Sequence, residues 1–189
     1  MASNKTVEFR VTGSVLAKVA RKMAPFYYKI AVNKTYAKAW SKAVREADLD
    51  KMEKLFQTAV TGKPNGLSAN GIGYFVDFEF PKPILQYTNG TSIIPGTAQF
   101  TFATPVHRAI AKAILLFYIK LSTDRSYAAS VASAVRSNNK RRLSHLVRMY
   151  VTSKALKSIT IDFAGFSLGF KYRGVKHTYE NTLFREFSG

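Results

Sequence analysis

Lysine and arginine are concentrated in two parts of this chain, and this uneven charge limits the folds that it can adopt. Residues 14–45 contain no Asp or Glu, residues 46–103 are close to neutral, and residues 104–176 are again strongly basic. The formal net charge is +18 on 189 residues. Unpaired charges are not buried and like charges repel one another, so both basic segments must keep a cationic face exposed to solvent or to an anionic partner.

The chain is nevertheless apolar enough to fold. Hydrophobic residues make up 47% and aromatic residues 13% of the sequence, which is too apolar for a disordered basic tail. Its length supports a substantial core, so we expect a single domain over residues 1–189, with a two-part organisation into 1–103 and 104–189 as an alternative. The absence of cysteine excludes disulfides, iron–sulfur clusters, zinc ribbons and thiol nucleophiles.

No part of the sequence predicts a membrane span or a secretory signal. The most apolar run, residues 113–119, lies between Lys112 and Lys120 and is far shorter than the roughly 20 residues that cross a bilayer. The first residues lack the apolar segment and cleavage pattern of a signal peptide. We therefore expect a soluble, intracellular protein (cytoplasm or nucleoid) or a component of a virion.

Hydrophobic periodicity predicts an α+β fold in which helices pack on antiparallel strands. Helical patterns fall into two groups, at about 14–60 and 105–155. Alternating patterns predict strands within 6–12, 73–103 and 158–173. Runs of helices followed by runs of strands are typical of α+β proteins rather than of alternating α/β proteins.

Local signals refine this expectation. Pro25 is expected to break or kink the first helix, and Asn89-Gly90 is expected to form a hairpin turn. Residues 61–73 are rich in glycine and predict a loop. A unit of helices followed by strands occurs twice, at 14–103 and 104–173. The residues of the two units do not align convincingly, so an internal duplication is the minor interpretation.

The first candidate for a functional surface is a helix predicted over residues 28–46. Its basic residues recur at helical spacing and lie within about 80° of one another around the helix axis, with apolar residues opposite. They are Lys34, Lys38, Lys42 and Arg45. A solvated helix face usually mixes acidic with basic residues, and none of these positions is interleaved with an acid. This pattern favours phosphate binding over an ordinary solvated face.

The second candidate is the basic cluster at the start of a helix predicted over residues 139–155. A helix N-terminus favours acidic residues, so a cluster of cations there is locally unfavourable and suggests an anionic partner. Arginine is well suited to such a partner because guanidinium groups bind phosphate in a bidentate manner. The alternative is an exposed helix end or a basic localisation signal. The residues are Lys140, Arg141, Arg142, His145 and Arg148.

The third candidate combines aromatic and basic residues near the C-terminus. Lys171, Arg173 and Lys176 follow a strand pattern that contains Phe163, Phe166, Phe170 and Tyr172. Aromatic side chains can stack on bases while cations hold the backbone. Because these aromatic residues mostly alternate on one side of the predicted strands, burial in the core is the favoured interpretation, and base stacking is the alternative.

Nothing in the sequence predicts catalysis, a metal site or a cofactor. Three histidines are present without metal-ligand spacing, and no phosphate-binding loop or nucleophile motif occurs. Asp77 and Glu79 share one side of a predicted strand and could in principle hold a metal ion in a nuclease. A strand with charged residues on its solvent side is the better explanation, so a metal-dependent nuclease is retained only as a minor alternative.

These observations favour a non-enzymatic nucleic-acid-binding protein of low sequence specificity. Phosphate contacts from Lys and Arg account for such binding without base recognition. The partner would be DNA, RNA or a nucleoprotein complex, and the protein could form a homo-oligomer. One alternative is a viral or phage structural or assembly protein that packs against nucleic acid or neighbouring subunits. Another is an inhibitor or accessory factor of a nucleoprotein complex.

Overall fold

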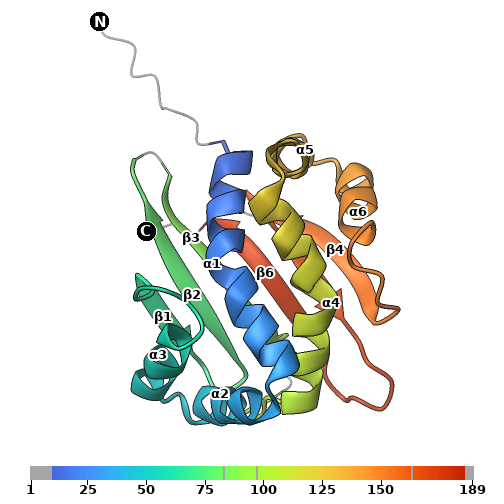
Figure 1. The fold of residues 1–189 in the computed structure, drawn as a ribbon. Coiled ribbons are helices and arrows are strands. Elements are labelled where there is room, and N and C mark those ends of the chain that lie inside the picture. Colours follow the sequence, from blue (N-terminus) through green and yellow to red (C-terminus); the bar gives the residue numbers. More distant parts are fainter. Residues whose placement is uncertain (1–9, 83, 97, 163, 186–189) are drawn as a thin grey trace, which may run out of the picture.

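The protein has an α+β fold built from two similar halves. The computed structural model describes residues 10–82, 84–96, 98–162 and 164–185. Each half contains three helices followed by three strands (Figure 1). The first half comprises α1 (Gly13–Val32), α2 (Lys34–Glu46), α3 (Leu49–Gln57), β1 (Gly66–Ala69), β2 (Gly73–Phe80) and β3 (Leu85–Ile93). The second comprises α4 (Thr104–Thr123), α5 (Arg125–Arg136), α6 (Lys140–Arg148), β4 (Leu156–Asp162), β5 (Gly165–Phe170) and β6 (Tyr179–Arg185).

The six strands form one antiparallel sheet in which the two halves meet at the centre. The strand order is β1-β2-β3-β6-β5-β4, so β3 of the first half pairs with β6 of the second. The helices cover one face of this sheet (Figure 1). The long helices α1 and α4 lie side by side over the centre, while α2 and α5 lie at opposite ends of the molecule. The order of the elements therefore has an approximate two-fold symmetry.

Individual hydrogen bonds repeat this symmetry. The Tyr36 hydroxyl donates to the Leu55 carbonyl at 2.9 Å, and the Tyr127 hydroxyl donates to the Leu146 carbonyl at 2.8 Å. The short α2–α3 and α5–α6 connections contain one left-handed residue each, at Ala47 and Asn138. Each residue in a helix of the first half is the same number of residues away from its equivalent in the second half. For residues in the strands this separation is one residue larger. We use the term pseudo-two-fold axis for the rotation axis that relates the two halves.

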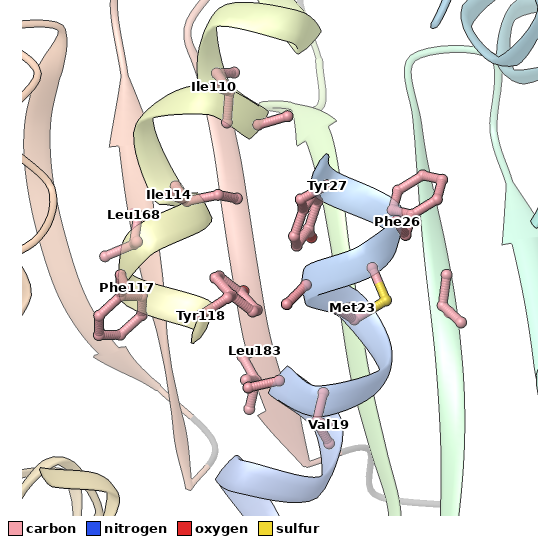
Figure 2. Packing of buried hydrophobic residues seen from close by; sticks show 14 of the residues in the cluster. Val19, Met23, Phe26, Tyr27, Ile110, Ile114, Phe117, Tyr118, Leu168 and Leu183 are labelled. Carbon is pink, nitrogen blue, oxygen red and sulfur yellow. The ribbon is translucent and has the colours of Figure 1, made fainter. Parts of the chain in front are cut away.

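The core lies between the helices and the covered face of the sheet. Figure 2 shows Met23 and Phe26 on the side of α1 away from α4, Ile114 and Phe117 on α4, and Leu183 of β6 below the space between the two helices. All five are completely buried. Because one continuous cluster contains residues of both halves, neither half has a separate core of its own.

A ring of polar groups lies inside this core at the pseudo-two-fold axis. The Tyr27 hydroxyl donates to Asn89 Oδ1 at 2.6 Å, and Asn89 Nδ2 donates to the Tyr118 hydroxyl at 2.6 Å. The Tyr118 hydroxyl donates to Asn181 Oδ1 at 2.7 Å, and Asn181 Nδ2 donates back to the Tyr27 hydroxyl at 2.8 Å. We call these four residues the central ring. It joins the two halves by hydrogen bonds that are hidden from water.

The first helix differs from the sequence-based expectation because Pro25 does not end it. α1 continues through Pro25 to Val32, and the break between helices occurs at Asn33 instead. Pro25 is exposed, whereas Met23 and Phe26 beside it are buried. Packing of these neighbours outweighs the loss of one backbone hydrogen bond at proline. The basic helix expected over 28–46 is accordingly divided between α1 and α2.

The expected Asn89-Gly90 turn is also wrong. Both residues lie in the middle of β3, where Asn89 pairs with Val76 and Gly90 with Phe75 of β2. The side chain of Asn89 belongs to the central ring, so it has partners that replace those of an exposed turn. The connection between β2 and β3 instead falls at residues 81–84.

Several strand boundaries differ from the sequence-based prediction as well. Residues 10–12 are not in a strand, and the rest of the strand expected over 6–12 lies outside the described residues. The 73–103 segment contains β2 and β3, but the described residues from 94 to 103 form no strand. β1 occurs within the segment expected to be a loop, and β6 occurs where no strand was expected. Both strands are recognisable only by their partners in the sheet.

Candidate nucleic-acid interface

The two sides of the protein differ in charge. The described strands hold the acidic residues Asp77, Glu79, Asp162 and Glu180, but only Lys157 and Arg185 among the basic ones. These acidic residues alternate with core residues and so lie on the sheet face that the helices do not cover. Partial burial, together with nearby Asp162, raises the pKa of Glu180. Most basic residues lie on the helices, so the helical side is the cationic one.

The basic row of α2 is only partly available to a partner. Lys34 and Lys38 are exposed. Lys42 is exposed too but forms an ion pair with Glu46 at 2.7 Å. Arg45 is partly buried, and its Nη1 donates to the Phe102 carbonyl at 2.8 Å.

The contact of Arg45 has an equivalent in the other half, which indicates a structural role. Arg136 Nη1 donates to the Val11 carbonyl at 2.7 Å. Each arginine thus ties the second helix of one half to the residues that precede the first helix of the other half. A phosphate contact would compete with this bond, so Arg45 is a weaker candidate than Lys34 and Lys38.

The basic cluster of α6 is well exposed. Asn139 caps the helix by accepting a hydrogen bond from the Arg142 backbone amide at 2.9 Å, and the first turn contains no acidic residue. Lys140, Arg141 and Arg142 are all exposed, as is His145. Arg148 is exposed as well, and its Nη2 lies 3.4 Å from the Leu156 carbonyl.

The third candidate group keeps its cations exposed, whereas two of its aromatic residues belong to the core and Tyr172 is partly buried with its ring stacked on Phe170. Phe166 and Phe170 are completely buried under the helices, so they belong to the core and cannot stack on bases. Phe163 lies outside the described residues. Arg173 and Lys176 are exposed, and Lys171 Nζ donates to the Lys176 carbonyl at 2.6 Å. This group lies in the β5–β6 connection.

These groups do not form one compact patch. α2 and α6 lie at different ends of the helical layer (Figure 1). Under the pseudo-two-fold axis α2 corresponds to α5, and α6 corresponds to α3. The cationic surface is therefore spread along the helical layer.

Two basic hollows repeat across the pseudo-two-fold axis. The first, which we name the α1–α5 hollow, has a volume of about 470 Å³, and Lys18, Arg21 and Arg125 line it. The second, the α2–α4 hollow, has a volume of about 450 Å³, and its lining includes Lys34, Lys38 and Arg108. Residues Ser14 and Arg125 of the first hollow are equivalent to Pro105 and Lys34 of the second. Each half thus contributes to both hollows.

One arginine in each hollow also holds the helical layer together. Arg21 Nη2 lies 3.4 Å from the Ser122 carbonyl at the end of α4. Arg108 Nη2 donates to the Ala31 carbonyl at the end of α1 at 2.8 Å. These carbonyls occupy equivalent positions, although the two arginines do not. The remaining cations, Lys18 and Arg125 in one hollow and Lys34 and Lys38 in the other, are exposed.

Sequence reasoning identified Lys34 and Lys38 but missed the other cations of the hollows. Lys18 and Arg21 lie on α1, Arg108 on α4 and Arg125 on α5. Lys18 and Arg21 come near Arg125 where α1 packs against α5, and Arg108 comes near Lys34 and Lys38 where α4 packs against α2. Recognition of the internal repeat would have been the one sequence signal able to connect them.

The described residues contain no group of three or more His, Asp or Glu side chains that could hold a metal ion. Asp77 Oδ1 accepts a hydrogen bond from the Thr88 hydroxyl at 2.8 Å. Among the described residues, no helix is long and apolar enough to cross a membrane. No protein-family model matches this chain, and no curated protein and no solved structure is significantly similar to it.

Proposed function

We propose that this protein is a non-enzymatic nucleic-acid-binding protein that contacts the phosphate backbone through its helical side with little sequence specificity. The observation that carries the proposal is the separation of charge between the two sides of the molecule. A formal charge of +18 would be costly to maintain on a compact body without an anionic partner. Lys and Arg contacts to phosphates release counterions and supply affinity that does not depend on sequence.

Among the described residues, the exposed cations do not gather at one site, which favours backbone contacts over base recognition. Exposed Lys and Arg occur at several separate sites, among them α2, α6, the α1–α5 hollow and the β5–β6 connection. Spread cations bind a repeating polyanion, whereas base recognition needs a few side chains directed into one groove.

A second candidate, an assembly subunit of a virion or similar particle, is favoured by the uncovered face of the sheet. Phe75 and Phe184 lie across this face with their ring centroids 6.4 Å apart. Such a face could pack on a neighbouring subunit, with the cationic helical side directed to nucleic acid. This candidate predicts a large oligomer that survives nuclease treatment and high salt.

The first experiment is the absorbance ratio at 260 and 280 nm of protein purified at low salt, repeated after a wash at about 1 M NaCl, where the Debye length is about 3 Å. We expect nucleic acid to co-purify and to be removed by salt. Affinity for labelled DNA and RNA should then fall with a log–log salt slope of about 0.9 per neutralised phosphate on a duplex.

Charge-reversal variants link this binding to the helical side. Lys38→Glu combined with Arg141→Glu should weaken binding at least tenfold. The matched control is Lys82→Glu combined with Lys157→Glu, which changes the net charge equally on exposed residues outside the helices. An equal loss in both variants would show that only net charge matters. Unchanged affinity in the first variant, with an unchanged thermal melt, would refute the proposed interface. Preference for one protein–nucleic acid complex over free nucleic acid would instead support an inhibitor or accessory factor.

A further inference from the structure

The two basic hollows are placed at opposite ends of the central helix pair. α1 and α4 each have 20 residues, and a helix of that length extends about 30 Å. The α1–α5 hollow lies at the start of α1, and the α2–α4 hollow lies at the start of α4. Because these helices run in opposite directions (Figure 1), the hollows are separated by roughly the length of one helix.

We infer that the partner is a double-helical nucleic acid that lies along α1 and α4 and places one backbone segment in each hollow. This inference rests on the proposed function and names its substrate class. Half-sites related by a two-fold axis of the duplex lie about 34 Å apart on one side of it, which is one helical turn and close to the separation of the hollows. A single duplex turn therefore reaches both.

The pseudo-two-fold axis favours a duplex over a single strand. The two strands of a duplex are antiparallel, so the duplex has two-fold axes perpendicular to its length, and two-fold proteins bind it with matching symmetry. Each half of the protein then contacts a segment of one strand, and the two segments run in the same direction relative to their own half. A single strand has one direction only, and would present opposite polarity to the two equivalent hollows.

The surface between the hollows offers apolar side chains for a groove contact, next to the exposed Lys112, which lies one turn before Leu116 on α4. Tyr28 on α1 and Leu116 on α4 are 57% and 60% exposed on the solvent side of the helix pair. Neither carries a charge that could hold a phosphate. Apolar and aromatic side chains do contact sugars and base edges in grooves. The phosphate contacts are thus assigned to the two ends and the groove contact to the middle.

The test measures binding of the full-length protein to labelled duplexes of about 6 and about 12 base pairs, which span roughly half a turn and slightly more than one turn. DNA and RNA duplexes are compared, together with a single strand as long as the longer duplex. One variant carries Lys18→Glu and Arg125→Glu in the first hollow. Another carries Lys34→Glu and Lys38→Glu in the second. Lys82→Glu with Lys157→Glu serves as the charge-matched control.

For the longer duplex we expect each hollow variant to bind at least tenfold more weakly than the control, and the two hollow variants to lose affinity to a similar extent. For the shorter duplex, which reaches one hollow at a time, each hollow variant should bind within about threefold of the control. The single strand should bind at least tenfold more weakly than the longer duplex. Comparison of the DNA duplex with the RNA duplex identifies which of the two is preferred.

Two results would overturn the duplex inference while leaving the proposed function intact. One is a single strand that binds as tightly as the longer duplex. The other is a loss in only one of the two hollow variants, which would show that the hollows do not act as a pair. If no nucleic acid binds at low salt in any form, the proposed function fails and this inference fails with it.

Discussion

The central ring is an unusual use of polar residues, because its four members are buried at the point where the two halves meet. Each tyrosine hydroxyl accepts a hydrogen bond from one asparagine and donates to the other. Burial raises the pKa of Tyr118 well above its usual value, so the hydroxyl stays protonated and can donate. A buried network of this kind is stabilising only while every member has a partner.

Replacing Tyr118 by Phe should therefore destabilise the protein. The change leaves an acceptor on Asn181 and a donor on Asn89 without this partner, at a cost of about 1–3 kcal/mol per buried unsatisfied group. Urea denaturation measures the loss. Tyr27→Phe should behave alike because of the pseudo-two-fold axis, whereas Tyr28→Phe, at an exposed position, should leave stability unchanged. A Tyr118→Phe protein as stable as the Tyr28→Phe control would contradict the role of the ring.

His107 is a buried residue at which the two halves differ in chemistry. It is completely buried and its Nε2 lies 2.9 Å from the Tyr74 hydroxyl. Its equivalent in the other half is Leu16, and that of Tyr74 is Phe166. Burial lowers the pKa of His107 to about 3, so the imidazole is neutral in the folded protein.

His107 should make the protein sensitive to acid. Below about pH 6.5 the unfolded chain binds a proton at this position and the folded chain does not, so stability decreases by about 1.4 kcal/mol per pH unit until the folded pKa is approached. The double variant His107→Leu with Tyr74→Phe, which copies the other half, should lose this dependence. Chemical denaturation at pH 7, 5 and 4 compares the two proteins. Parallel curves would show that His107 is not the source.

At the scale of the elements, α3 and α6 occupy equivalent places but differ in charge, since α3 mixes acidic with basic residues and α6 contains no acidic residue. The first turn of α3 contains Asp50, whereas the equivalent residue of α6 is Arg141. An acidic residue near a helix N-terminus is stabilising, and a basic one is not. Arg141 therefore makes α6 less stable than an acidic residue would at this position, but it leaves a cation exposed.

Arg141→Asp should separate stability from binding. It should raise the free energy of unfolding by about 0.3–1 kcal/mol, because it gives the first turn of α6 the acidic residue that α3 has at the equivalent position. It should also weaken binding to nucleic acid. Thermal melts and fluorescence anisotropy measure the two effects. Loss of both stability and affinity would mean that Arg141 serves the fold rather than a partner.

An element could be predicted from the sequence when the interactions that form it join residues close together in the chain. Asp48 and Asp124 cap helices, and both do so through side-chain hydrogen bonds from backbone amides three residues later. Local hydrogen bonding of this kind is readable from neighbouring residues. Asn89 was misinterpreted because its ring partners, Tyr27 and Tyr118, are distant in the sequence. β6 was missed because it is a strand by virtue of pairing with β3 and β5.

At the scale of the whole molecule, the concentration of positive charge on the helical side should lower the folding stability of the protein when no partner is bound. Repulsion among exposed charges is screened by salt, and the Debye length falls from about 30 Å at 0.01 M to about 10 Å at 0.1 M ionic strength. We therefore expect the melting temperature to rise over this range. A variant with Lys140, Arg141 and Arg142 all changed to Gln should respond less. A melting temperature that falls with added salt would show that ion pairs, rather than repulsion, dominate.

The sequence alone determined the α+β class, the amphipathic helices and the excess of positive charge, because periodicity and composition are local properties. Only the tertiary structure decided which cations become neighbours. It divided the basic 28–46 segment at Asn33, engaged Arg45 in an internal hydrogen bond, and brought Lys18 and Arg21 together with Arg125. These outcomes depend on the packing of α1 against α4 and on the pairing of β3 with β6. Such contacts join residues far apart in the chain, and no short stretch of sequence encodes their energy.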